Sequence, residues 1–259
     1  MANEEKKIKN RVNRQVAATS DGVDKFLLSL GSFLQFNLND ILKGLKDGKV
    51  RGVEAAAQLG GLLTELDKRG LKKEIGGIKE IFAKELRFIA DEFEEQGITD
   101  IFSGSDKQTV NALINVQLSK TDLEIKRYGV NIQAAVMNQV IAGKDIGVIL
   151  AKNPPKEKLG WIRSEINTAV MAFNRTITAS KAEELGLNLF LYTGPDDDVT
   201  RPFCDHLLDR NPAIYTKEEI DRMDNKQGLS VMTYGGGYNC RHHWRAISKE
   251  LAEQLGYEN

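Results

Sequence analysis

Apolar residues recur at helical spacing over most of the first 185 residues, and this periodicity constrains the fold more than any other feature. One stripe spans residues 82–93 and is flanked by charged positions, which is typical of an amphipathic helix. A longer stripe spans residues 162–177, follows Pro154 and Pro155, and stops near Gly186. The stripes predict a mainly helical chain. Their members are Phe82, Leu86, Ile89 and Phe93, then Ile162, Ile166, Ala169, Phe173 and Ile177.

The last third of the sequence has a different hydrophobic pattern, in which short apolar runs alternate with turns. The run "LNLFLY" at residues 187–192 predicts a buried strand, and "LSVMTY" at residues 229–234 predicts a second one. Thr216 and Ser248 each stand where a helix N-cap is expected, and Glu219 completes a capping box with Thr216. We therefore expect a compact α+β module here.

Consecutive prolines in "KNPPKEK" at residues 152–158 mark the best candidate for a linker, because proline cannot continue a helix. The sequence thus predicts two parts. Residues 1–153 form an elongated helical N-terminal region, and residues 154–259 form a long helix plus a small α+β module. The expected fold class is mainly α.

Charge and hydropathy narrow the class of protein. The 36 basic residues against 37 acidic ones give a net charge of -1, so the chain as a whole has no electrostatic attraction to nucleic acid or anionic lipid. The apolar run at residues 26–36 is shorter than the roughly 18 to 20 residues of a membrane span. The charged start "MANEEKKIKNRVNRQ" is not a secretory signal. We expect a soluble protein without a structural disulfide.

All of the cysteines and histidines, two and three in number, lie between positions 204 and 243. Cys204, His206, Cys240 and His242 or His243 would give zinc two sulfurs and two nitrogens. Each pair is Cys-x-His instead of the usual Cys-x2-Cys, but residues two apart in a strand face the same side and could converge on one ion. Two buried thiols with hydrogen-bonded histidines are the favoured explanation, because the usual zinc spacing is not met, and the metal interpretation stays open here.

A nuclease site is a second alternative. His242 or His243 could act as a general base beside a metal held by Asp196, Asp197 or Asp198. A run such as "GPDDD" is also typical of an exposed turn. The sequence has no phosphate-binding loop and no nucleophile elbow, so we expect no enzyme. The triple glycine at residues 235–237 indicates a flexible loop or a close approach of the backbone.

The order of these signals resembles the C-terminal domain of the phage Mu F-like minor head, or head morphogenesis, family over about residues 160–250. The resemblance rests on "NRTITASKAEELG", "LFLY", "DVTRPFCDHL", "YTKEEID" and "GGGYNCRHHW", in that order. His242 stands where other members carry a second cysteine, and Gly237 and Tyr238 replace a common His-Pro. The positions that match the family motif are Asp198, Arg201, Cys204, Asn239, Cys240, Arg241 and His242.

The resemblance implies a virion structural protein associated with the portal vertex or the inner capsid, and not an enzyme. Its implied partners are the portal protein and a major capsid or scaffolding protein, with a homo-oligomer and packaged DNA left open and no membrane. It would reside in the phage head, and in the host cytoplasm during assembly. The alternative is a metal-dependent nuclease or toxin-like effector domain carried in the head. Under the structural interpretation, Arg241 is expected to pair with Asp198 or Asp205.

Overall fold

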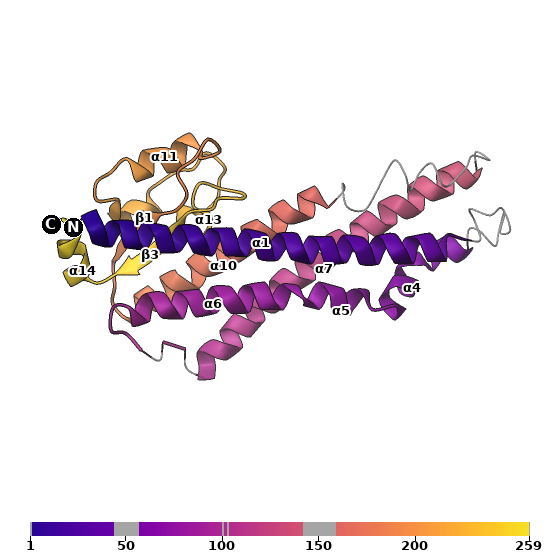
Figure 1. Ribbon diagram of the computed structural model, residues 1–259, viewed down its shortest axis with the longest axis horizontal. Coiled ribbons are helices and arrows are strands. Elements are labelled where there is room, and N and C mark those ends of the chain that lie inside the picture. Colours follow the sequence, from indigo (N-terminus) through magenta and orange to yellow (C-terminus); the bar gives the residue numbers. More distant parts are fainter. Residues whose placement is uncertain (1, 44–56, 100, 103, 142–158, 259) are drawn as a thin grey trace. The chain divides into compact units, whose positions relative to one another are not determined.

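The computed structural model describes residues 2–43, 57–99, 101–102, 104–141 and 159–258 (Figure 1). The chain divides into two compact units that are interleaved along the sequence. Unit 1 comprises Met1–Gly22, Glu80–Ile114 and Ser164–Asn259, and unit 2 comprises Val23–Lys79 and Asn115–Arg163. The predicted linker at residues 152–158, with the domain boundary at residues 153 and 154, lies outside the described residues and stays a prediction.

Long helices account for most of the chain, as the periodicity predicted. Their bounds are Ala2–Ile41 for α1, Leu62–Lys68 for α4, Leu71–Gly76 for α5, Ile78–Glu94 for α6, Gly104–Ile141 for α7 and Gly160–Glu184 for α10. The stripe at residues 82–93 is buried in α6 except for the half-buried Leu86. Helix α10 ends just before Gly186, whose φ of 69° and N–H bond to Glu183 O at 3.1 Å reverse the chain.

Unit 2 has an aliphatic core built from parts of α1 and α7 together with α4 and α5. Leu34, Leu62 and Leu66 are buried within it, as are Ile125 and Val136. Its surface carries ion pairs, among them Arg69 with Asp40 at 2.6 Å and Arg163 with Asp24 at 2.7 Å. Because exposed ion pairs contribute little to stability, apolar burial is the main stabilising contribution in this unit.

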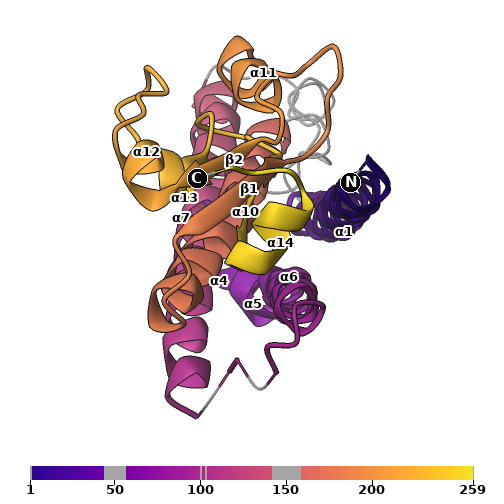
Figure 2. The same cartoon turned by 90° about the vertical axis from the view of Figure 1, so that its left-hand side faces the viewer.

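Unit 1 contains a small antiparallel sheet in the order β2-β1-β3 (Figure 2). The strands are Leu189–Thr193 for β1, Ile214–Thr216 for β2 and His243–Ile247 for β3. Tyr192 pairs with Trp244 across β1 and β3, and Phe190 pairs with Tyr215 across β1 and β2. The predicted fold class is confirmed: a mainly helical chain carries a small α+β module, and the strand predicted at residues 187–192 is β1.

Short helices surround the sheet. They are Pro202–Leu208 for α11, Lys217–Asp221 for α12, Val231–Tyr234 for α13 and Lys249–Gln254 for α14. The predicted caps are confirmed, because Thr216 forms a capping box with Glu219 and Ser248 accepts from the N–H of Leu251. The predicted strand "LSVMTY" is wrong. Ser230 caps a helical turn there, and the third strand is the segment "HWRAI", which is buried at every position.

The outer edge of β3 is closed by a side chain from the end of α6. Gln96 donates from Nε2 to the carbonyl of Ala246 at 3.0 Å and accepts at Oε1 from the N–H of Ser248 at 2.9 Å. An exposed strand edge would offer unpaired backbone groups to other chains. The amide of Gln96 therefore pairs two backbone groups at this edge, as a neighbouring strand would.

Among the helices described, we find none that combines the length and the apolar character needed to span a bilayer.

Candidate metal centre

The segments "RPFCDHL" and "NCRHH" meet in unit 1, as the sequence led us to expect. Cys204 lies in α11, and its Sγ is 3.8 Å from Sγ of Cys240, which precedes β3. Nδ1 of His242 lies 3.7 Å from the Cys240 sulfur. We call these three residues the sulfur–imidazole group. Their ligand atoms all lie within 4.8 Å of one another and the residues are buried, so the group could hold a metal ion.

His206 does not belong to this group, which corrects the four-residue set expected from the spacing. The expectation required an extended strand, in which residues two apart face the same side. Cys204 and His206 instead lie on helix α11, where two residues turn the side-chain direction by about 200°. Cys204 is consequently buried and His206 exposed. The choice between His242 and His243 is also settled, because His243 bonds through Nδ1 to Asn174 Oδ1 at 3.1 Å.

The backbone of the triple glycine at residues 235–237 packs closely against the sulfurs of Cys204 and Cys240. Gly235 has φ 56°, and a Cβ there would stand 2.9 Å from the Cys240 sulfur. A Cβ on Gly236 would overlap the sulfur of Cys204. The N–H of Gly236 donates to the Cys240 sulfur at 3.3 Å. Of the two explanations that the sequence left open, close backbone approach holds at this point.

Aromatic rings cover the group on the side of the sheet. The ring of Tyr192 in β1 stacks on His242, with centroids 5.1 Å apart and planes 12° apart. Trp244 lies 4.4 Å from Tyr192 and donates from Nε1 to the carbonyl of Val231 at 3.0 Å. The hydroxyl of Tyr192 reaches the Cys240 sulfur at 3.9 Å. Water is therefore excluded from this side of the sulfurs.

Arg175 in α10 holds the loop that carries Cys240 and His242. Its guanidinium is buried and donates to Cys240 O at 2.8 Å, to His242 O at 2.6 and 2.9 Å, and to Thr233 O at 3.2 Å. Arg175 was not among the site residues predicted from the sequence. A charged side chain inside the apolar stretch "TAVMAFNRTITA" is the signal that could have found it.

The surroundings make the two thiols unequal. The hydrogen bond from Cys204, followed by the charge of Arg175, lowers the pKa of Cys240 well below that of an ordinary thiol. The same hydrogen bond, together with burial, raises the pKa of Cys204. Burial raises the pKa of the Tyr192 hydroxyl. Cys240 is therefore the sulfur that gives up its proton first.

The other motif residues make bonds within the same loops. Arg241 donates to both carboxylate oxygens of Asp197 at 2.5 and 2.8 Å, which lowers the pKa of Asp197 to about 2. The expected partners Asp198 and Asp205 are thus corrected to Asp197, and Asp198 itself is exposed. Arg201 donates to Tyr238 O at 2.5 Å.

Asn239 belongs to the motif through its backbone. It has φ 56°, a left-handed conformation that asparagine tolerates better than most residues. Its N–H donates to Oγ1 of Thr168 in α10 at 2.8 Å. The asparagine therefore turns the chain so that Cys240 enters the core.

The arrangement does not favour the nuclease interpretation. Asp196 lies 3.7 Å from Lys9, and Asp197 is engaged by Arg241. In the described part of the chain, these loop carboxylates form no metal-binding group with either histidine. A general base has to reach its substrate, whereas His242 and His243 are buried.

A second polar cluster lies on the other side of β3. His243 bonds to Asn174, which donates to Glu85 Oε1 at 2.8 Å, and Thr19 donates to Glu85 Oε2 at 3.0 Å. Burial raises the pKa of Glu85 and lowers the pKa of His243 to about 3. No sequence pattern points to this cluster, because Glu85 stands among exposed charged residues of α6 with nothing to set it apart.

An ion pair extends the buried polar region along α6. Glu92 lies 3.8 Å from Nε of Arg245 in β3, and both side chains are almost fully buried. Burial raises the pKa of Glu92 to about 7, against the opposing charge of Arg245. Arg245 also donates to Glu95 Oε2 at 2.9 Å. These contacts fasten β3 to α6.

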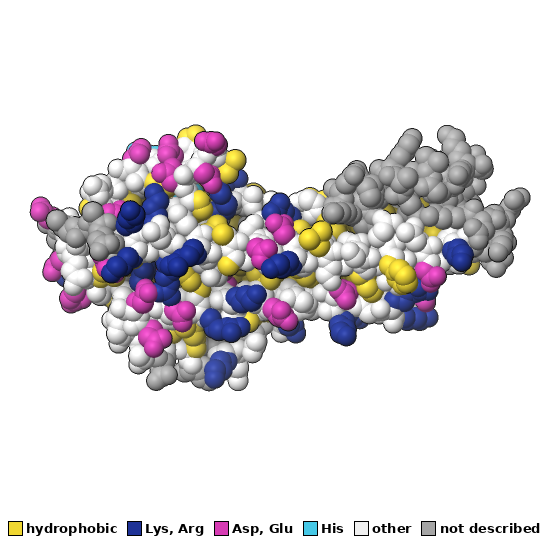
Figure 3. All heavy atoms as spheres, in the orientation of Figure 1, with side chains coloured by type: hydrophobic (Ala, Val, Ile, Leu, Met, Phe, Trp, Pro, Cys, Tyr) yellow, Lys and Arg dark blue, Asp and Glu magenta, His cyan; other side chains and the backbone are white. Residues whose placement is uncertain are grey.

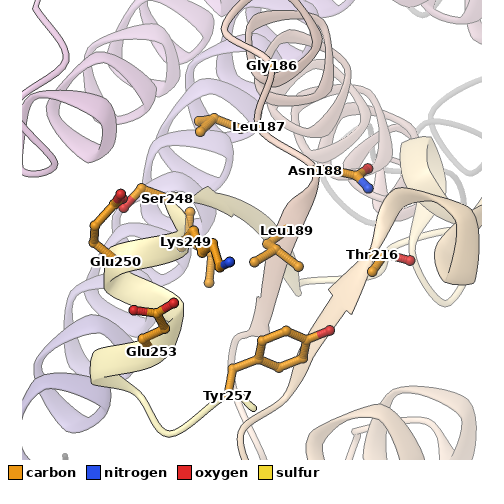
Figure 4. A pocket seen from close by; sticks show the side chains of 11 residues that line it. Gly186, Leu187, Asn188, Leu189, Thr216, Ser248, Lys249, Glu250, Glu253 and Tyr257 are labelled. Carbon is orange, nitrogen blue, oxygen red and sulfur yellow. The ribbon is translucent and has the colours of Figure 1, made fainter. Parts of the chain in front are cut away.

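A cavity of about 460 Å³ opens beside the sheet (Figure 4). Leu189 and Ile247 form its apolar part, and Lys249, Glu253 and Tyr257 contribute from α14 and the residues that follow it. Elsewhere, basic and acidic side chains are interspersed over the face shown in Figure 3.

Comparison with known protein families, curated proteins and solved structures found no match to this chain.

Proposed function

We propose that this protein is a structural component of a tailed-phage head, a minor capsid or head morphogenesis protein that associates with the portal vertex or the inner capsid. The observation that carries the proposal is the convergence of the motif segments. The sulfurs of Cys204 and Cys240, which lie far apart in the sequence, are 3.8 Å apart in the core. The residues that carry the family resemblance thus serve one folded module.

The use of the motif residues supports a structural role over a catalytic one. Arg241 is bound to Asp197, Arg201 to a backbone carbonyl, and the backbone of Asn239 to Thr168. Each of these contacts is internal and joins loops to one another or to α10. A catalytic constellation would instead aim polar groups at a space that a substrate can enter. The module is therefore suited to act as a rigid anchor.

Unit 2 offers a surface for protein contacts. Val116, Leu123 and Val130 recur every seven residues along α7, and each is at least half exposed. Phe36 of α1 is 73% exposed in the same unit. Apolar residues repeated at heptad spacing favour contact with another helix. In this proposal the partner is the portal, a capsid or scaffolding protein, or a second copy of the chain, in the virion or in the host cytoplasm during assembly.

A Zn²⁺ ion at the sulfur–imidazole group also fits the proposal, because it would tie α11 to the loop before β3 and stiffen the anchor.

Binding to the cognate portal tests the proposal. We expect the purified full chain to co-sediment with portal assemblies, and the variant Val116→Ser/Leu123→Ser/Val130→Ser to bind more weakly. Val199→Ser, which removes an apolar side chain that is 74% exposed in unit 1, is the matched control and should bind as well as the wild type. Absence of binding to portal, capsid and scaffolding proteins would contradict the proposal. Metal-dependent cleavage of DNA by the purified chain would favour the enzyme alternative.

A further inference from the structure

The distances within the sulfur–imidazole group match the edges of a zinc tetrahedron. Zn–S bonds of about 2.3 Å and Zn–N bonds of about 2.0 Å place two sulfurs about 3.8 Å apart and a sulfur and a nitrogen about 3.5 Å apart. The corresponding distances are 3.8 Å between the cysteine sulfurs and 3.7 Å from Cys240 Sγ to His242 Nδ1. The remaining edge, from Cys204 to His242, is within 4.8 Å. Modest adjustment of one side chain would complete the geometry.

The polar groups here are poorly satisfied by one another. Nε2 of His242 has no hydrogen-bond partner among the described residues, and Nδ1 faces only the Cys240 sulfur. The Tyr192 hydroxyl also has a sulfur for its neighbour. Thiols are weak donors and weak acceptors, and buried polar groups normally have better partners. A cation bound by Nδ1 and by both sulfurs would replace these weak sulfur contacts with metal–ligand bonds, and Nε2 would still have no partner among the described residues.

Two hydrogen-bond donors lie close enough to the Cys240 sulfur to stabilise a metal-bound thiolate there. The N–H of Gly236 points at its sulfur from 3.3 Å, and the Tyr192 hydroxyl lies 3.9 Å from it. Hydrogen bonds to ligand atoms orient a metal site and tune its affinity. The backbone of Gly235 and Gly236 keeps the space beside the sulfurs free of side chains. The site is thus built around the sulfurs and closed to water.

We propose that Cys204, Cys240 and His242 bind one thiophilic divalent cation of the Zn²⁺ class, and that Gly236 N–H and the Tyr192 hydroxyl donate to the Cys240 thiolate. His206 takes no part. Both thiols lose their protons on binding, so two thiolates and a neutral imidazole meet the charge of the ion. The ion joins α11 to the loop before β3 and has a structural role. This inference does not depend on the role of the protein in a phage head.

Metal content of the full chain, purified without chelators, tests the proposal. We expect close to one zinc per chain in the wild type and in His206→Ala, the matched control from the same segment. Cys204→Ser and Cys240→Ser should lose the metal. Replacement of zinc by Co²⁺ should give a thiolate-to-cobalt charge-transfer band in the wild type and in His206→Ala. Tyr192→Phe should keep the band and bind the metal about 10 to 100 times more weakly.

A second measurement covers serine variants that do not fold. A chelator should lower the melting temperature of the wild type and of His206→Ala to the same extent. Wild-type protein that contains no zinc, shows no cobalt–thiolate band and melts at the same temperature with and without chelator would overturn the proposal. A disulfide between Cys204 and Cys240 in freshly purified protein would also overturn it. Loss of the metal in His206→Ala would refute the ligand assignment.

Discussion

The two units of this molecule have different kinds of interior. Unit 2 buries mainly leucine, isoleucine and valine, together with Phe26, and the side chains with polar atoms that are buried among its described residues are Asn37, Thr121 and Tyr128. Unit 1 holds every buried charged or histidine side chain that the structure describes, namely Glu85, Glu92, Arg175, Lys181, His242, His243 and Arg245. Aliphatic packing tolerates exchange between residues of similar volume, whereas buried polar groups need particular partners. Unit 1 therefore depends on specific polar pairings, whereas unit 2 depends on the volume and the helical spacing of its apolar side chains.

The largest effect should come from Arg175. Replacement by methionine leaves the carbonyls of Cys240, His242 and Thr233 without their donor, and we expect a loss of about 3 to 5 kcal/mol in the free energy of unfolding. Arg127→Met in unit 2 is the control, because this exposed arginine pairs with Glu124 on the helix surface and its replacement should cost less than about 0.5 kcal/mol. Urea unfolding measures both. Equal losses in the two variants would remove the contrast between the units.

Matched exchanges inside the two cores sharpen the contrast. Asn174→Leu keeps the side chain about the same size but removes the partner of Glu85 Oε1 and of His243 Nδ1, so it should cost about 2 to 4 kcal/mol. Leu34→Met makes a similar change of shape in unit 2 and should cost less than about 1.5 kcal/mol. Both are read from urea unfolding. A tolerated leucine at position 174 would show that the polar cluster is not needed.

The pH dependence of stability should reveal the buried carboxyl of Glu92. Its folded pKa of about 7 lies above the ordinary 4.5, so the folded state holds a proton that the unfolded chain releases. Its contribution is therefore complete below pH 4.5 and is lost as the pH rises through 7. His243, with its pKa lowered to about 3, acts in the opposite sense and is most favourable above its ordinary 6.5.

Glu92→Gln separates these two contributions. Without the carboxyl, the free energy of unfolding should rise more from pH 5 to pH 7 than it does in the wild type, by about 2 kcal/mol. Urea unfolding at several pH values measures the difference. Parallel curves for wild type and Glu92→Gln would show that this carboxyl does not hold its proton in the fold.

The smallest effect on stability should come from the outer face of unit 2. Leu123 is 57% exposed, so Leu123→Ser should change the free energy of unfolding by less than about 0.5 kcal/mol. If this face binds other helices, the same change should reduce self-association in sedimentation velocity. A loss of stability as large as that of a core leucine would show that Leu123 is packed within the chain.

Sequence patterns predicted the helices and caps well, because periodicity and capping are local. The stripe at residues 82–93, the capping box at Thr216 and the strand at residues 187–192 were all read correctly. The run "LSVMTY" misled, since its apolar residues suit a strand as well as a buried helical turn. Ser230 and Gly235 decided between the two.

The candidate site was predicted in part. The clustering of cysteine and histidine along the chain correctly brought Cys204 to Cys240 and His242. It placed His206 wrongly, because the argument assumed a strand where the chain forms α11. Arg175 and Glu85 were missed, since their importance depends on partners about 60 or more residues away that no local pattern reveals.

The bond between Gln96 and the backbone of β3 has a consequence for how the chain is made. The amide finds its partners, Ala246 and Ser248, only about 150 residues later in the chain. All segments of unit 2 have been synthesised by residue 163, so its aliphatic core can assemble on the ribosome. The first 22 residues and those from 80 to 114 must wait for the final strand. A chain that stops before β3 would therefore contain these two segments without their packing partners. We expect proteases to cleave such a chain at those segments.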